Sequence, residues 1–161
     1  MIFGMSPFTV FHVVLSLIGI AAGFIALGGW LRGHLRSGWT VVFLVTTIAT
    51  VLTGFVFPFT VVTPAIVFGI ISTVVLAIAV FALYRQHLLG RWRLAFLLSA
   101  LFALYLNTFV LIVQAFQKVG PLNALAPTGT EPPFAVAQIL LLVVFIALGY
   151  RLLRRSVPFA T

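Results

Sequence analysis

The sequence predicts an all-α membrane protein, a bundle of five transmembrane helices that forms one domain over residues 1–161. Its composition is 63% hydrophobic and only 6% charged, with a mean hydropathy of +1.32. A soluble domain carries about 25% charged residues, so this chain has too few polar side chains to make a surface that faces water. Five apolar stretches also approach or exceed the roughly 20 residues that a helix needs to cross a bilayer.

The five predicted helices are separated by loops that contain Pro, Gly or Arg. Pro64 and Pro133 stand where the third and fifth helices begin, and Pro is well tolerated in the first turn of a helix. The second stretch is short and the "FPFTVVTP" that follows it is apolar, so a re-entrant hairpin of the second and third stretches stays open as an alternative. The stretches run over about residues 8–31, 40–57, 64–83, 94–117 and 134–153.

Positive charge predicts the orientation of these helices, because cytoplasmic loops collect Lys and Arg. Lys118 and the only acid, Glu131, lie in the fourth loop, whereas the N-terminal residues and the second loop carry no charged side chain. This distribution places the N-terminus outside and the C-terminus in the cytoplasm. The other basic residues lie in the first loop, in the third loop and after the last helix: Arg32, Arg36, Arg85, Arg91, Arg93, Arg151, Arg154 and Arg155.

Composition and spacing also exclude several classes of function. The basic residues form short clusters between apolar runs rather than a continuous stripe, so nucleic acid is not an expected partner. The chain has no Cys, and no metal site is predicted. No carboxylate lies inside a predicted helix, which argues against a proton-coupled carrier. Because Ser16, Ser72 and Ser99 have no accompanying base and acid, we predict that the protein is not an enzyme.

Five polar residues within the predicted helices form the candidate ligand-binding site: His12, Thr53, Asn107, Gln114 and Gln138. His12 and Gln138 each lie four residues inside the outer boundary, at a depth of about 6 Å, and Thr53 and Gln114 lie at a similar depth. Asn107 is seven residues below Gln114 on the same helix face. Unpaired amides are unfavourable in hydrocarbon, so these groups should face one another. They predict either hydrogen bonds between helices or a pocket, open to the outer leaflet, for the head of a quinone or lipid.

Two further histidines, His34 and His87, lie in the loops predicted at the cytoplasmic side, each beside Arg, Gly and Trp. Imidazole titrates near neutral pH and ligates haem iron, so the pair is a weak candidate for the axial ligands of a b-type haem. The alternative is that both are loop residues of the head-group region. The cofactor therefore stays unknown at this point, with quinone, lipid and haem b as the options.

Small residues predict close contacts between helices. Gly19 and Gly23 form a G-x-x-x-G pattern, and Thr46, Thr50 and Gly54 recur at a spacing of four. Such faces pack helices closely, and a five-helix bundle needs them internally. A weaker interpretation is a pore for a neutral solute, lined by Thr46, Thr50, Thr53 and Asn107.

Three segments, "GIAAGFIALGGWLRGHLRSGW" from Gly19, "TGFVFPF" from Thr53 and "RQHLLGRWR" from Arg85, resemble small multi-pass proteins of the bacterial inner membrane whose function is uncharacterised. The likeness covers about the first two thirds of the chain. It implies a helical bundle in the bacterial inner membrane and supplies no activity. The His-Arg pairing expected from it is absent, since Leu follows both His34 and His87.

These observations predict a non-enzymatic membrane protein that serves as an accessory or assembly subunit of a larger complex. Its expected partners are the lipid bilayer and other membrane subunits. The alternative is a quinone-, lipid- or haem-binding redox or carrier component, with a polar pocket in the outer leaflet.

Overall fold

The structure is a computed structural model, and it describes residues 6–35, 37–57 and 64–154 of the 161-residue chain. Every regular element in these ranges is helical, and five of the helices are long and apolar enough to cross a membrane, as the sequence predicts. The elements are α1 (Pro7–Trp30), α2 (Ser37–Val56), α3 (Pro64–Val80), the π-helical turn η1 (Phe81–Arg85), α4 (Arg91–Lys118), α5 (Gly120–Leu125) and α6 (Pro132–Arg154).

The second and third predicted stretches are each long enough to span. The helix α2 begins three residues earlier than predicted and has 20 residues, while α3 and η1 together give a 20-residue apolar helix from Ile66 to Arg85. A helix of this length reaches across a typical bilayer, which favours two spans over a re-entrant hairpin. The connection at 58–63 lies outside the described residues. The short helix α5 was not predicted.

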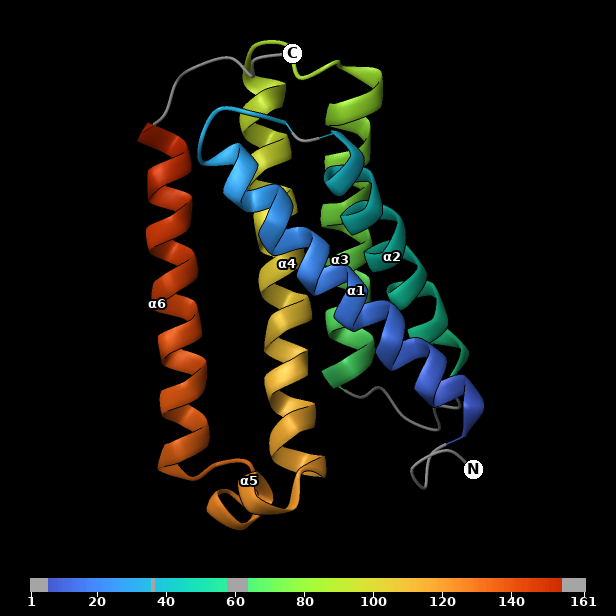
Figure 1. Cartoon of the computed structure of the whole chain (residues 1–161), viewed down its shortest axis with the longest axis vertical. Coiled ribbons are helices and arrows are strands. Elements are labelled where there is room, and N and C mark those ends of the chain that lie inside the picture. Colours follow the sequence, from blue (N-terminus) through green and yellow to red (C-terminus); the bar gives the residue numbers. More distant parts are fainter. Residues whose placement is uncertain (1–5, 36, 58–63, 155–161) are drawn as a thin grey trace.

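The five long helices run alternately up and down, with α4 at the centre (Figure 1). The pair α1 and α2 packs along most of its length, and α4 contacts α1, α3 and α6. The helix α6 stands at the edge of the bundle and packs chiefly on α4, and the ring of its Phe145 lies 6.1 Å from that of Phe24 in α1.

The apolar core lies in the half of the bundle that holds the α1–α2 and α3–α4 connections. Small residues in the second half of α1 let its neighbours approach closely. A Cβ added to Gly23 would lie 2.6 Å from Leu104 Cδ1 and 2.9 Å from Phe43 Cδ2. The predicted internal role of the Gly19 and Gly23 pattern is therefore confirmed, since both residues are buried.

Trp30 closes this core and fixes the turn from α1 to α2. Its indole Nε1 donates to the Leu35 carbonyl and to Thr40 Oγ1, each at 3.2 Å. The ring meets Phe43 and Phe96 edge-on, at centroid distances of 6.1 and 5.4 Å. A buried indole needs such a partner for its N–H. Trp30 is thus a packing element of the core.

Candidate functional site

A cavity of about 370 Å³ opens among α1, α2, α3 and α4, in the half of the bundle opposite the apolar core. Apolar side chains make most of its wall. Phe55 of α2 and Gly69 of α3 meet there, and a Cβ on Gly69 would lie 2.9 Å from Phe55 Cζ. Nine polar residues share the lining: Thr9, His12, Ser16, Thr47, Thr50, Ser72, Asn107, Gln114 and Lys118.

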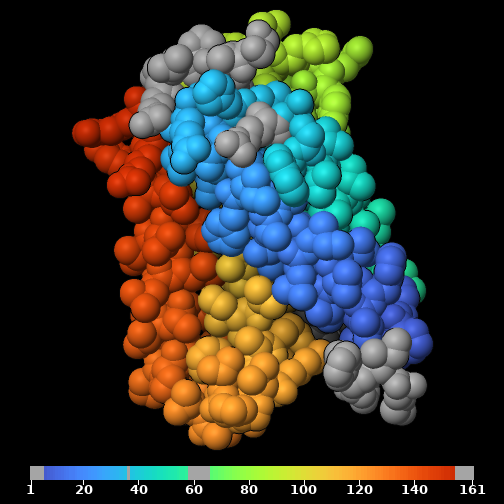
Figure 2. All heavy atoms as spheres, viewed as in Figure 1, coloured from blue at the N-terminus to red at the C-terminus, as the bar shows by residue number. Residues whose placement is uncertain are grey.

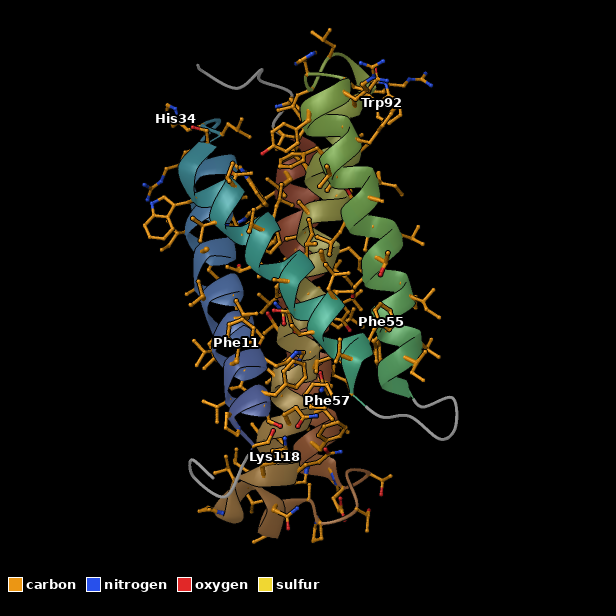
Figure 3. The ribbon with its side chains drawn as sticks, turned by 90° about the vertical axis from the view of Figure 1, so that its right-hand side faces the viewer. Phe11, His34, Phe55, Phe57, Trp92 and Lys118 are labelled. Atoms are coloured by element: carbon orange, nitrogen blue, oxygen red, sulfur yellow. The ribbon has the colours of Figure 1, made fainter. Side chains whose placement is uncertain are left out.

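The buried residues of α1 and α2 lie mainly in the half of the bundle away from the cavity. In α1 every buried residue lies at or after Gly19, and in α2 every buried residue lies at or before Thr47. In the first half of α1, His12 and Val13 line the cavity, and His12 still contacts α2 through Thr53. Figure 3 shows Phe57 and Lys118 at the cavity end of the molecule, with His34 and Trp92 at the opposite end.

The cavity has polar residues at two depths, and we call those nearer its mouth the outer layer. This layer centres on His12, which is bonded to Thr53, so that the pair joins α1 to α2. Nδ1 of His12 lies 2.8 Å from Thr53 Oγ1. The Thr53 hydroxyl donates to the Ala49 carbonyl at 2.7 Å, so its oxygen accepts the hydrogen of His12 Nδ1. Phe57 meets the imidazole edge-on at 5.3 Å. This arrangement fixes the ring and leaves Nε2 for another partner.

Gln114 and Lys118 complete the outer layer from α4. They are four residues apart and lie on one helix face. Lys118 is exposed and ends α4, where a cation is favourable beside the free carbonyls of the helix terminus. Glu131, the only acid in the chain, does not line the cavity. The mouth therefore offers hydrogen-bond donors and one positive charge, which suits a neutral or anionic head group.

An inner layer lies deeper, where Thr47 and Asn107 approach Gly19. A Cβ added to Gly19 would lie 3.1 Å from Thr47 Oγ1 and 3.4 Å from Asn107 Nδ2. Both polar atoms are buried, and neither has a hydrogen-bond partner among the described residues.

No protein-family model, curated protein or solved structure matches this chain. The site geometry is therefore what indicates function.

The structure brings together four of the five predicted ligand-binding residues. His12, Asn107 and Gln114 line the cavity, and Thr53 supports His12 from behind. Gln138 lies elsewhere, on α6, where its Nε2 donates to the Phe109 carbonyl at 3.3 Å. The depth argument from the sequence carried no information on which side of α4 Gln138 stands.

The two histidines of the haem hypothesis lie at the other end of the molecule. His34 and His87 are both exposed and belong to different connections, α1–α2 and α3–α4. His87 and Leu88 have positive φ angles of 49° and 58°, in the tight turn that follows η1. Leu88 packs against the apolar core from this turn. The haem hypothesis stays a prediction, and its residues are remote from the cavity.

Sequence reasoning missed Thr47 and Lys118 as parts of the site. Thr47 could have been found from a seven-residue spacing between candidate residues that recurs in three helices. His12 and Gly19 are seven apart on α1, Gly54 and Thr47 on α2, and Gln114 and Asn107 on α4. Seven residues return to the same helix face, so each helix contributes to an outer and an inner layer. Of the proposed pore stripe, Thr50 and Asn107 line the cavity, whereas Thr46 and Thr53 are not among its lining residues.

Proposed function

We propose that this protein binds an amphiphilic molecule of the bilayer, a quinone or a lipid, with the polar head held in the cavity by His12, Gln114 and Lys118. One observation carries the proposal: a cavity of about 370 Å³ in an otherwise apolar bundle has a wall with buried, unpartnered polar atoms. Small-molecule sites have volumes of about 300–1,000 Å³, mostly apolar walls and a few convergent polar groups.

The lining supports an amphiphile rather than a wholly polar solute. Its apolar part, from residues such as Val13, Val51 and Leu111, matches a hydrocarbon or isoprenoid tail. Its polar part lies toward the end where α4 finishes at Lys118, so a head group placed there stays near water while the tail reaches inward. A molecule already dissolved in the bilayer gains access without crossing an aqueous phase.

The orientation of the protein follows from its charges and is part of the proposal. The loops at the core end carry Arg32, Arg85, Arg91 and Arg93, whereas the cavity end carries Lys118 and Glu131. The positive-inside rule places the first group in the cytoplasm. The cavity then opens toward the outer leaflet of a bacterial inner membrane, as expected from the sequence.

The test is purification of the full chain in a mild detergent, followed by organic extraction and mass spectrometry. One quinone or lipid species, enriched over bulk membrane lipid, should accompany the wild-type protein and be lost from Gln114→Leu. Gln138→Leu is the matched control, because it removes the same amide from a helix outside the cavity. Extracts that match bulk lipid in all three proteins would refute the proposal.

The other expectations remain predictions with their own tests. An accessory or assembly subunit should co-purify with a membrane partner at fixed stoichiometry. A haem held by His34 and His87 should give a reducible Soret band in the visible spectrum, and a colourless preparation would remove that option.

A further inference from the structure

We infer that the ligand of this cavity carries a second polar oxygen, about 10 Å from its head, which binds between Thr47 and Asn107 at the inner layer. We call these two residues the inner subsite. The inference rests on the proposed function and narrows it. The ligand becomes an amphiphile with a hydroxyl or carbonyl group partway along its tail.

The Thr47 hydroxyl differs from the other threonine hydroxyls of α2. Thr46, Thr50 and Thr53 each donate to the backbone carbonyl four residues earlier, at 2.7 to 2.8 Å. Thr47 has no such bond, although its side chain is only 2% exposed. A hydroxyl buried in an apolar bundle is unfavourable unless it is paired. Since Thr47 lines the cavity, a ligand oxygen is a suitable partner for its hydroxyl.

Asn107 faces the same point from α4. Its Nδ2 is buried without a partner, and it donates hydrogen only. The Thr47 hydroxyl both donates and accepts. One oxygen atom lying between them therefore satisfies both groups if it belongs to a carbonyl, which accepts twice, or to a hydroxyl, which accepts from Asn107 and exchanges a hydrogen bond with Thr47.

Gly19 leaves space beside these two groups. A Cβ at position 19 would lie 3.1 Å from both Thr46 Oγ1 and Thr47 Oγ1 and 3.4 Å from Asn107 Nδ2, so a methyl group there would stand against the inner subsite. By contrast, Gly28 on the same helix has nothing within 4 Å of its added Cβ. The small residue at position 19 thus has a role beyond helix packing.

The spacing of the two layers sets the length of the ligand. Seven residues of helix rise about 10 Å, and α1, α2 and α4 each repeat the interval. An extended chain advances about 1.2 Å per bond, so the two polar groups of the ligand are separated by roughly eight or nine bonds. The two oxygens of a quinone ring are too close together to reach both layers, and the inner subsite therefore favours a lipid-like ligand with an oxygenated tail.

The experiment uses two probes that differ by one oxygen atom: stearate, and stearate with a hydroxyl on its tenth carbon. Both are offered in equal amounts to the full-length protein in detergent, and native mass spectrometry measures the ratio of the two bound species. We expect the hydroxylated probe to be preferred by about threefold to tenfold, the gain of one net hydrogen bond. Moving the hydroxyl to the fifth carbon should abolish the preference.

Variants assign the preference to the inner subsite. Thr47→Val and Gly19→Ala should both bring the ratio to about one, whereas Thr108→Val should keep it. Thr108 is the control because it is buried, lies outside the cavity and donates to the Leu104 carbonyl at 2.8 Å. Asn107→Leu replaces Thr47→Val if that variant does not fold. The ratio is measured within one sample, so it is independent of the folded fraction.

Each outcome decides the inference. Equal binding of both probes to the wild type overturns the inner subsite but leaves an amphiphile site in place. A preference that persists in Thr47→Val and Gly19→Ala also overturns it. Binding of neither probe refutes the inference, and the proposed function is then decided separately by the extraction of native ligand.

Discussion

The imidazole Nδ1 of His12 and the hydroxyl oxygen of Thr53 lie 2.8 Å apart, although the two residues are 41 positions apart in the chain. This bond joins α1 to α2 where the small-residue contacts of the core have ended. It holds the two helices together beside the cavity while keeping His12 turned toward it. The same pair therefore contributes to the stability of the bundle and to the shape of the site.

Replacing Thr53 with Val should lower the stability of the bundle, because Val has nearly the same side-chain volume as Thr but no hydroxyl. The substitution removes the oxygen that accepts from His12, and polar contacts between membrane helices contribute about 0.6–2 kcal/mol. Unfolding by a denaturing detergent in mixed micelles measures the loss. Thr73→Val is the control, because the Thr73 hydroxyl donates only to the Gly69 carbonyl of its own helix. Equal losses in the two variants would contradict a role for the bond between helices.

Two glycines of α1 should respond in opposite ways to Ala. At Gly23 the new methyl group meets Leu104 and Phe43, both fully buried, so overpacking should cost about 1–3 kcal/mol. At Gly28 nothing lies within 4 Å, and the higher helix propensity of Ala should leave stability unchanged or raise it by up to about 1 kcal/mol. The same unfolding assay compares them, and a destabilised Gly28→Ala with an unaffected Gly23→Ala would refute the packing described for α1.

Glu131 should titrate far below an ordinary glutamate. Hydrogen bonds from the Thr128 backbone N–H, and then from the Thr128 hydroxyl and the Thr130 N–H, lower its pKa to about 2. The folded state therefore gains stability from this carboxylate above the unfolded pKa of 4.5, and this gain is lost as the pH falls from 4.5 toward 2.

The measurement is direct because the chain contains a single acidic side chain. A ¹³C label on the glutamate carboxyl gives one side-chain signal whose titration reports the pKa. In Thr128→Ala the hydroxyl donor is lost, so the pKa should rise toward 4.5. A wild-type midpoint near 4.5 would show that the turn does not hold the carboxylate in solution.

The orientation can be tested with single cysteines, because the natural chain has none. Thr128→Cys places a thiol in the α5–α6 connection and Gln86→Cys places one in the α3–α4 connection. A maleimide that does not cross membranes should label position 128 in intact cells and position 86 only after the cells are opened. The reverse pattern would put the cavity mouth at the cytoplasmic face and refute the proposed topology.

Sequence alone was sufficient to predict five helices that are long and apolar enough to cross a membrane. A helix that crosses a bilayer needs an apolar surface and must pair its backbone groups internally. Such helices can therefore be recognised in a sequence as runs of about 20 apolar residues. The five long helices and the packing role of Gly19 and Gly23 follow from this local information. Helix ends shifted by a few residues, and α5 was missed because a six-residue helix has no periodic signal.

The site was only partly predictable, because depth along a helix is a property of the sequence but direction around the bundle is not. Sequence placed His12, Thr53, Gln114 and Gln138 at one level, yet Gln138 bonds to the far side of α4. Tertiary structure alone showed that the buried residues of α1 lie at or after Gly19 and those of α2 at or before Thr47, and that a cavity forms among α1, α2, α3 and α4 toward the other end. Figure 2 shows atoms of α4 at the surface between α6 and α1 in the lower half of the view. Hydrophobicity along the sequence determines the five long apolar helices, whereas the way their side chains meet in the tertiary structure determines where the bundle encloses a cavity.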